Sequence, residues 1–350
     1  MLKTKAYGAQ SASAAIEAME IERREPGPYD VLIEVLYCGV CHTDIHMSRG
    51  QYPQLIYPMV PGHEVVGKVV QVGSAVRRHK IGDTVGVGCM VDSCRVCSEC
   101  LVGEEQFCAD RVYTYNALER DGKTPTYGGY SSRMTVDEGY VLRVSPKLNP
   151  AAAAPLLCAG ITTYSPLRHW KVGSHSKLGI IGLGGLGHMA VKIASAMGAH
   201  VTVLSTTEDK RQDALRLGAA DFAVTREPDT FTRLAGQFDL ILNTVSASVN
   251  YDAFITLLKR DGNLVILGLP DAPLSISASG LMLKRRSVCA SLIGGIQQTQ
   301  EMLDFCAEHG IVSDIELIGA DRINEAYDRI LKSDVRYRFV IDMARGICVD

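Results

Sequence analysis

The fold of this chain is indicated by one stretch, Leu178-Gly179-Ile180-Ile181-Gly182-Leu183-Gly184-Gly185-Leu186-Gly187. Its first four residues have the apolar character of a buried strand, and Gly182 to Gly187 follow the pattern G-x-G-x-x-G. The residues from Gly184 to Met197 then have helical character, and the helix is expected to end at Gly198. A strand that runs through such a turn into a helix predicts the first βα unit of a dinucleotide-binding domain.

Each glycine of the turn has a separate role in this interpretation. Gly182 permits the tight turn, Gly184 lets the backbone approach a pyrophosphate, and Gly187 lets the helix pack close to the strand. The N–H groups at the helix start, with those of Gly185 and Leu186, are expected to bind the phosphates. The alternative is a glycine-rich turn that binds no ligand.

The residues that follow alternate between apolar strands and helical segments. Together with residues 178–181, five further apolar runs predict six strands, and a helix is expected around residues 209–217. This alternation is typical of a doubly wound parallel sheet. The five runs are residues 200–204, 222–224, 240–242, 264–267 and 288–292.

The end of the second strand predicts which dinucleotide binds. NAD enzymes place a carboxylate there for the ribose 2′-hydroxyl, whereas this chain reads Ser205-Thr206-Thr207 with Lys210 beyond. Hydroxyls and a lysine suit a 2′-phosphate, which a carboxylate would repel. NADP(H) is therefore favoured. The alternative, NAD, would use Glu208 or Asp209, which suit the start of the next helix better.

Four cysteines lie in a long aperiodic segment of the first half. That half is otherwise β-rich, with strands expected at residues 31–37 and 65–72, while residues 89–130 show little periodicity. The spacing Cys94-x2-Cys97-x2-Cys100-x7-Cys108 predicts a structural zinc site, which would also pin the segment. An iron–sulfur cluster and unrelated core cysteines are the alternatives.

A second set of ligand types is spread along the chain. Cys41 follows a strand, His63 lies in Gly62-His63-Glu64, and Cys158 precedes the dinucleotide-binding half. Two thiolates and one imidazole leave the fourth position of a zinc ion open, which is the catalytic pattern. We therefore expect a catalytic zinc ion beside the dinucleotide site. A core position is the usual alternative for Cys158.

Bulk properties exclude several classes of protein. A length of 350 residues suggests two domains, and a net charge of −3 gives no reason to expect a nucleic-acid partner. The start has no signal-peptide pattern and no stretch is long enough to cross a membrane, so we expect a cytoplasmic protein. Eleven cysteines, an odd number, argue against a disulfide framework. Five of them, Cys38, Cys89, Cys289, Cys306 and Cys348, remain as core or incidental positions.

The motifs together resemble a known family. Gly62-His63-Glu64-x2-Gly67-x5-Gly73-x2-Val76 is similar to the zinc signature of the medium-chain dehydrogenase/reductases, and the resemblance covers essentially the whole chain. Segments 39–44, 156–162 and 182–188 resemble the cinnamyl-alcohol-dehydrogenase branch, and within it bacterial broad-range NADP-dependent aldehyde reductases. The resemblance implies a GroES-like catalytic domain with a Rossmann domain. We expect the catalytic domain at residues 1–152 with its zinc lobe at about 89–115, the Rossmann domain at 153–296, and a return to the catalytic domain at 297–350.

The resemblance also implies roles for single residues. Cys41, His63 and Cys158 would hold the catalytic zinc, with Glu64 as an occasional ligand and Asp44 as a hydrogen-bond partner of His63. Further residues are implied around the reaction and the cofactor: Thr43 at the substrate oxygen, His46 as the next proton carrier, and His42, Thr162 and Arg338 at the cofactor. The alternatives are a surface or core histidine for His46 and a surface charge at a strand edge for Arg338.

The sequence thus predicts a zinc-dependent alcohol dehydrogenase that reduces aldehydes with NADPH, with a broad range that includes aromatic aldehydes. Met90, Tyr113, Tyr115 and Leu292 are candidate pocket residues. The family implies a homodimer through the edge of the Rossmann sheet, at residues 288–292. An NAD-dependent zinc alcohol or polyol dehydrogenase, a zinc-binding interaction module with a vestigial Rossmann fold, and a thiol redox sensor are the alternatives.

Overall fold

The computed structural model describes residues 1–270 and 272–345, which form two compact units. The first unit contains Met1–Cys158 and the segment from Gly294 onward, and the second contains Ala159–Ile293. Cys348 lies outside the described residues. None of the described helices combines the length and the apolar character that crossing a membrane requires.

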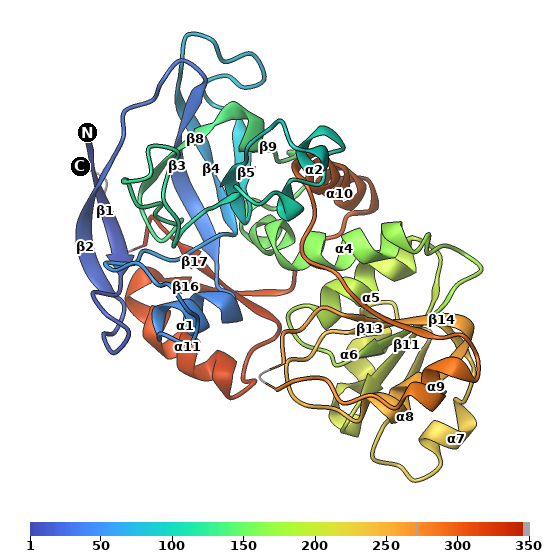
Figure 1. The fold of residues 1–350 in the computed structure, drawn as a ribbon. Helices are drawn as coiled ribbons and strands as arrows, with labels where there is room; N and C mark the ends of the chain where they lie inside the picture. The colour runs from blue at the N-terminus through green and yellow to red at the C-terminus, as the bar shows by residue number, and fades with distance from the viewer. Residues whose placement is uncertain (271, 346–350) are drawn as a thin grey trace. The chain divides into compact units, whose positions relative to one another are not determined.

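The second unit is built on a parallel sheet (Figure 1). Among the described residues its strand order is β12-β11-β10-β13-β14-β15, so the chain winds outward from β10 first to one side and then to the other. This order confirms the predicted doubly wound sheet. The strands are β10 (Lys177–Ile181), β11 (His200–Ser205), β12 (Asp221–Val224), β13 (Phe238–Asn243), β14 (Leu258–Ile266) and β15 (Ser287–Ala290).

Helices cover this sheet. α5 packs on β10 and β11, α6 packs on β12, and α8 packs on β14. α5 starts at Gly187 rather than at Gly184, because residues 182–186 form the turn itself. The helices of this unit are α4 (Ala159–His169), α5 (Gly187–Ala196), α6 (Arg211–Arg216), α7 (Thr230–Arg233), α8 (Tyr251–Thr256) and α9 (Ala278–Met282).

The first unit holds a mostly antiparallel sheet. In the described part of the chain its strands run in the order β16-β17-β3-β4-β5-β9, and β8 pairs with β3. The last strand of the chain thereby lies beside β3, with Val340 opposite Gly39. The strands are β3 (Asp30–Gly39), β4 (Val65–Val72), β5 (Thr84–Val87), β8 (Arg133–Asp137), β9 (Leu142–Arg143), β16 (Ile315–Gly319) and β17 (Arg338–Asp342).

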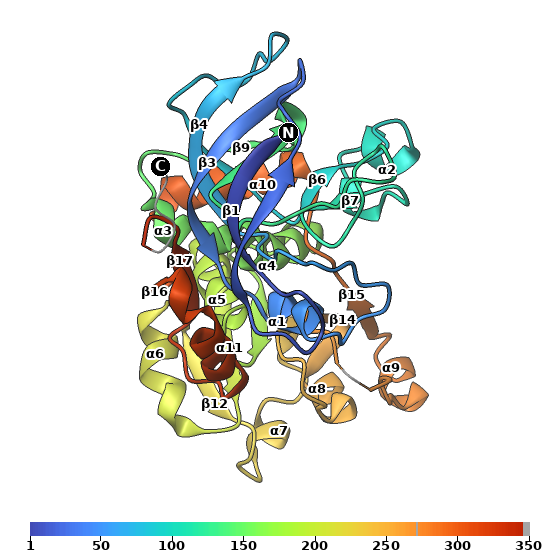
Figure 2. The same cartoon turned by 90° about the vertical axis from the view of Figure 1, so that its left-hand side faces the viewer.

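Smaller elements surround this sheet. Strands β1 (Leu2–Gly8) and β2 (Glu17–Arg23) form a hairpin, and α10 (Ile296–His309) buries Met302, Leu303 and Cys306. α1 (His42–Ser48) packs against α11 (Ile323–Leu331), and both views show these two helices side by side (Figures 1 and 2). The cysteine-rich segment contains β6 (Met90–Asp92), α2 (Ser98–Leu101) and β7 (Val112–Tyr113), and α3 (Pro150–Ala153) precedes Cys158.

Candidate functional site

Asp44 organises the start of α1. Its carboxylate is fully buried and accepts hydrogen bonds from the backbone N–H of Cys41 at 2.8 Å and from that of Gly62 at 3.1 Å. The Nδ1 atom of His63 lies 3.2 Å from the same carboxylate. Asp44 therefore ties the strand-to-helix turn that carries Cys41 to the loop that carries His63, and it leaves Nε2 of His63 as the ligand nitrogen.

The predicted catalytic ligands come together in the first unit. One ligand atom from each of Cys41, His63, Glu64 and Cys158 lies within 4.8 Å of all the others, and all four residues are buried. Cys41 follows β3, His63 and Glu64 precede β4, and Cys158 follows the short helical segment Ala154–Leu157. Elements far apart in the sequence thus place two thiols and one imidazole around a common point, which is the donor set of an open zinc site.

The acid–base state of these thiols fits a metal ion. A hydrogen bond from Cys158 lowers the pKa of Cys41 well below its usual range, and sharing that proton raises the pKa of Cys158. One of the two thiols is therefore readily ionised, and a bound cation would favour loss of the second proton. The residues present fit zinc.

Glu64 makes a buried ion pair with Arg338. Arg338 is 6% exposed and Glu64 is fully buried, so the alternative of a surface charge for Arg338 is wrong. Burial raises the pKa of Glu64, and the charge of Arg338 opposes that rise. The second carboxylate oxygen of Glu64 is buried without a hydrogen-bond partner among the described residues. It lies so close to Gly39 that any side chain at that position would collide with it.

The residues predicted for proton transfer lie along α1. The Cys41 thiol is 3.7 Å from the hydroxyl of Thr43, which places Thr43 next to the metal ligands. The rings of His42 and His46 are stacked with 6.1 Å between their centroids. The Nδ1 atom of His46 also contacts the side-chain oxygen of Gln51. Sequence reasoning missed Gln51, because its position just beyond the helix becomes informative only once α1 is formed.

Two further residues, Cys89 and Tyr115, lie near the ligands, although the sequence predicts a core or incidental position for Cys89 and only a candidate pocket position for Tyr115. Cys89 donates a hydrogen bond to the carbonyl oxygen of Leu157 at 3.8 Å, and the neighbouring Cys158 thiol lowers its pKa, so its interpretation as a core or incidental residue is incomplete. Cys38 and Cys306, in contrast, are buried core positions. The ring of Tyr115 stacks on that of His63, with 5.8 Å between centroids and 22° between planes. The sequence spacing predicts neither contact, because in each pair the two residues come from different segments of the chain.

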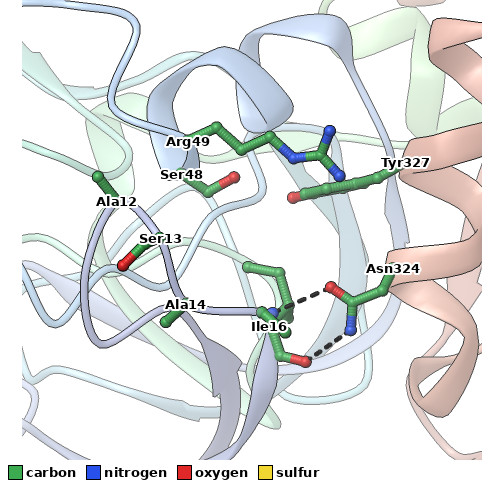
Figure 3. A pocket seen from close by; sticks show the side chains of 9 residues that line it. Ala12, Ser13, Ala14, Ile16, Ser48, Arg49, Asn324 and Tyr327 are labelled. Atoms are coloured by element: carbon green, nitrogen blue, oxygen red, sulfur yellow. Dashed lines mark hydrogen bonds between the residues drawn. The ribbon is translucent and has the colours of Figure 1, made fainter.

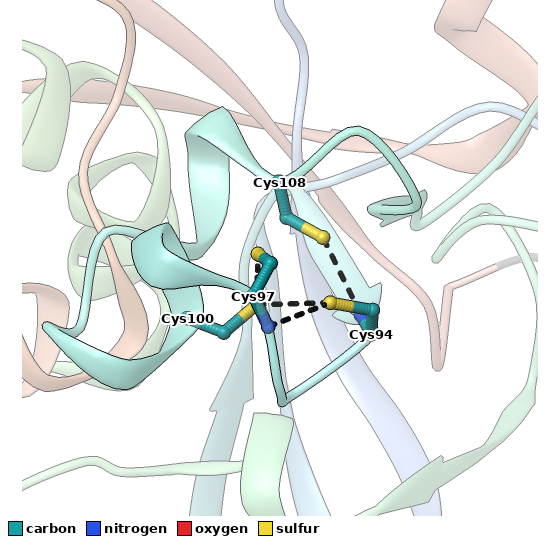
Figure 4. A group of neighbouring side chains, drawn as sticks. All are labelled: Cys94, Cys97, Cys100 and Cys108. Carbon is teal, nitrogen blue, oxygen red and sulfur yellow. Dashed lines mark hydrogen bonds between the residues drawn. The ribbon is translucent and has the colours of Figure 1, made fainter.

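The four cysteines of the lobe converge as predicted (Figure 4). The Sγ atom of Cys100 lies 3.5 Å from that of Cys97 and 3.9 Å from that of Cys94. Tetrahedral Zn²⁺ with thiolate ligands requires sulfur–sulfur distances of roughly 3.8 Å. Backbone N–H groups of Val96 and Cys97 lower the pKa of the Cys94 thiol to about 6. The Sγ of Cys108 accepts from the backbone N–H of Cys94 at 3.4 Å and completes a set that fits zinc.

The glycine-rich turn lies at the end of β10 in the second unit. Gly182 has a φ of 87°, in the left-handed region that favours glycine. A Cβ atom on Gly187 would lie 2.2 Å from the carbonyl oxygen of Gly182, so only glycine allows the helix to start there. A Cβ atom on Gly184 would meet nothing within 4 Å, so the backbone of Gly184 faces open space. This arrangement fits a pyrophosphate.

The residues after β11 that are predicted to bind the cofactor differ in their contacts and exposure. Lys210 donates a hydrogen bond from Nζ to the carbonyl oxygen of Leu183 at 3.4 Å, so it reaches the glycine-rich turn. Arg211 is held instead by an ion pair with Glu208 and by the ring of Phe222. Ser205 is buried at the end of the strand, whereas Thr206 and Thr207 are exposed. Thr162 lies buried in α4, and no described contact tests its predicted role.

A cavity of about 410 Å³ lies at the other end of α1 (Figure 3). Tyr327 forms one wall, and Asn324 binds both the backbone N–H and the carbonyl of Ile16 there. Arg49 at its rim pairs with Asp328. None of the predicted site residues lines this cavity.

Comparison with known proteins shows which family models and relatives this chain matches. Residues 27–146 match the model of the alcohol dehydrogenase GroES-like domain, and residues 185–308 match that of the zinc-binding dehydrogenases. An NADP-dependent alcohol dehydrogenase C of Mycolicibacterium smegmatis is 56% identical over 98% of this chain and 99% of its own. The aldehyde reductase YahK of Escherichia coli is 55% identical over 97% of this chain and 98% of its own.

Two solved structures of cinnamyl alcohol dehydrogenases are also similar to this chain over nearly its whole length. A cinnamyl alcohol dehydrogenase of Sorghum bicolor superposes with a TM-score of 0.96 at 42% identity, and the match covers both chains completely. A cinnamyl alcohol dehydrogenase of Helicobacter pylori in complex with NADP(H) superposes with a TM-score of 0.92 at 41% identity over 99% of each chain. Given the two family models, the near-complete coverage and the converging ligands, this chain belongs to the zinc-binding alcohol dehydrogenase family with a GroES-like domain.

Proposed function

We propose that the protein is a zinc-dependent alcohol dehydrogenase that transfers hydride reversibly between NADP(H) and a primary alcohol or aldehyde, and works chiefly as an aldehyde reductase. The observation that carries this proposal is the convergence of Cys41, His63 and Cys158, with Glu64 beside them, in a chain whose second unit has a glycine-rich turn after β10. The near-identical length and the names of its relatives support the same reaction.

Cys41, His63 and Cys158 would hold the catalytic zinc ion, and Cys94, Cys97, Cys100 and Cys108 would hold the structural one. A zinc ion in the open site supplies Lewis-acid polarisation of a carbonyl oxygen, and a reduced nicotinamide supplies hydride. The protein's own residues orient the metal ligands. Asp44 fixes His63, and the Arg338 charge compensates the buried Glu64 carboxylate, whose second oxygen is available for the metal.

The proton that reduction consumes would come from the chain's own hydroxyl and imidazole groups. Thr43 would give a proton to the product oxygen, and the 3.7 Å distance from its hydroxyl to the Cys41 thiol supports this role. His46 lies one turn further along α1 and would hold the proton that restores the Thr43 hydroxyl. The imidazole of His42 stacks on that of His46 and would lie beside the proposed path. His42 and Arg338 are also proposed to contact the cofactor phosphates.

The cofactor is proposed to lie along the turn of Gly182, Gly184, Gly185, Leu186 and Gly187. Lys210, with Ser205, Thr206 and Thr207, would bind the 2′-phosphate. The open space at Gly184 and the reach of Lys210 to Leu183 support this placement. Thr162 is kept as a proposed cofactor contact on the family resemblance alone.

The metal dependence of turnover tests this proposal. Purified protein should contain two zinc ions per chain, and the variant Cys158→Ser should keep one and lose aldehyde reduction with NADPH. Removal of the catalytic zinc should abolish the reaction, and zinc should restore it. If wild-type protein with one zinc ion or none reduced cinnamaldehyde at the full rate, the proposal would be wrong.

A homodimer and a cytoplasmic location complete the proposal. β15 is an edge strand, and Met282 and Leu283 just before it are 79% and 82% exposed. Met282 and Leu283 lie at the end of α9, and such exposed apolar side chains beside a sheet edge suit pairing with a second copy. The strand ends at Ala290 rather than Leu292, because the backbone turns at Ile293, where φ is 35°. The double variant Met282→Glu, Leu283→Glu should sediment as a monomer. The thiol ligands require a reducing compartment, which supports the cytoplasm.

A further inference from the structure

We infer that Tyr115 is a positioning residue that fixes the plane of the His63 imidazole for metal binding. The inference rests on the proposed catalytic zinc site. The two rings are stacked, with centroids 5.8 Å apart and planes 22° apart. Tyr115 is 5% exposed and His63 is 5% exposed, so the stack is a buried contact that solvent does not weaken.

The stack restrains the tilt of the His63 ring plane, which the hydrogen bond to Asp44 leaves free. That bond holds Nδ1 of His63 at 3.2 Å, but a single contact at one ring atom allows a range of tilts of the ring plane. A zinc ligand must direct its other nitrogen at the metal within a narrow angle. A near-parallel ring packed beside the imidazole, with 5.8 Å between centroids, restricts the tilt that the hydrogen bond permits.

The backbone on both sides of Tyr115 is anchored. The backbone N–H of Thr114 donates to the carbonyl of Cys89 at 3.1 Å, and the side chain of Asn116 accepts from the backbone N–H of Ile56 at 2.8 Å. The segment leaves the cysteine lobe through β7, only a few residues after Cys108. Tyr115 therefore belongs to a segment that is held on both sides and that begins at the cysteine lobe.

The ring, and not the hydroxyl, carries this role. The Tyr115 hydroxyl is buried and has no hydrogen-bond partner in the described parts of the chain. Phenylalanine would keep the stack and remove an unsatisfied buried group.

The release of zinc to a chromophoric chelator tests the inference without reference to activity. Two phases are expected from wild-type protein, and Cys158→Ser identifies the catalytic one by removing it. Tyr115→Leu should release the catalytic zinc about 2- to 12-fold faster, which corresponds to the roughly 0.5–1.5 kcal/mol of a buried ring pair. Tyr115→Phe should release it at the wild-type rate. The structural phase should not change in Tyr115→Phe.

Tyr113→Leu is the matched control, because Tyr113 lies in the same segment and its hydroxyl contacts Arg111 rather than His63. Tyr115→Met replaces the leucine variant if the latter does not fold. The inference is overturned if the leucine and methionine variants keep the wild-type rate, or if Tyr113→Leu accelerates the catalytic phase equally. A single zinc ion in wild-type protein, held by the lobe, would instead overturn the proposed catalytic site itself.

Discussion

Arg338 and Glu64 form a buried ion pair although 274 residues separate them in the sequence. β17 carries Arg338 to the edge of β3, and the loop before β4 carries Glu64 to the same place. The last part of the chain therefore supplies a charge that the ligand cluster of the first unit requires.

Removing the arginine should destabilise the fold strongly. Arg338→Met leaves a buried carboxylate without its partner, which costs about 3–5 kcal/mol when one side of such a pair is lost. The free energy of unfolding in urea, measured on zinc-replete protein, checks this. Arg322→Met is the control, because Arg322 pairs with Glu325 on the surface and its loss should change little. An equal effect of both substitutions would contradict the buried pair.

Much of the site follows from the sequence, because it rests on chemistry with fixed spacing. The lobe cysteines lie within fifteen residues, and Gly182 to Gly187 form one turn, so local pattern suffices for both. The ligand set of Cys41, His63 and Cys158 needed the family resemblance in addition. The six strands of the parallel sheet are recognisable because buried strands are uniformly apolar.

The remainder depends on contacts between segments that no local pattern connects. The sequence leaves the environment of Arg338 open, since a charged residue at a strand start is usually exposed. The stack of Tyr115 on His63 depends on how loops pack, whereas the contact of Gln51 with His46 depends on the formation of α1. The start of α5 was placed three residues early, because glycine turns and helix starts share the same residue types.

Lys210 is expected to decide the cofactor preference. Its amine reaches the glycine-rich turn, so Lys210→Ala should lower kcat/KM for NADPH by about 10- to 100-fold through loss of a charge-assisted hydrogen bond. The value for NADH should change little. Arg211→Ala should leave both values close to wild type, since Glu208 and Phe222 already hold that guanidinium. Initial rates of both variants with NADPH and with NADH check this prediction. A larger loss in Arg211→Ala than in Lys210→Ala would mean that Arg211, and not Lys210, binds the 2′-phosphate.

His46 is expected to carry the proton. His46→Ala should lower kcat by about 10- to 100-fold and alter the pH profile, because Thr43 would lose its proton donor. His169→Ala, at the exposed end of α4, should leave both unchanged. Full activity of His46→Ala with the wild-type pH profile would show that the relay is wrong.

Cys306 should make stability depend on alkaline pH. Burial raises the pKa of its thiol to about 12, whereas the unfolded chain ionises near its usual value. Above roughly pH 9 the unfolded state binds one proton fewer, so stability falls by about 1.4 kcal/mol per pH unit until the folded pKa is reached. The contribution is complete below pH 9. Urea unfolding at about pH 8 and pH 10 should therefore show a smaller loss in Cys306→Val than in wild type, and equal losses would contradict the buried neutral thiol.

Initial rates of cinnamaldehyde reduction with NADPH and with NADH, measured on zinc-replete protein, test whether this zinc enzyme reduces aldehydes with NADPH. We predict turnover with a preference for NADPH of at least about tenfold, which the 2′-phosphate contacts would provide. A preference for NADH would contradict the role of Lys210 and leave the zinc dehydrogenase in place. No reduction with either cofactor, in protein that holds two zinc ions per chain, would contradict the proposed reaction.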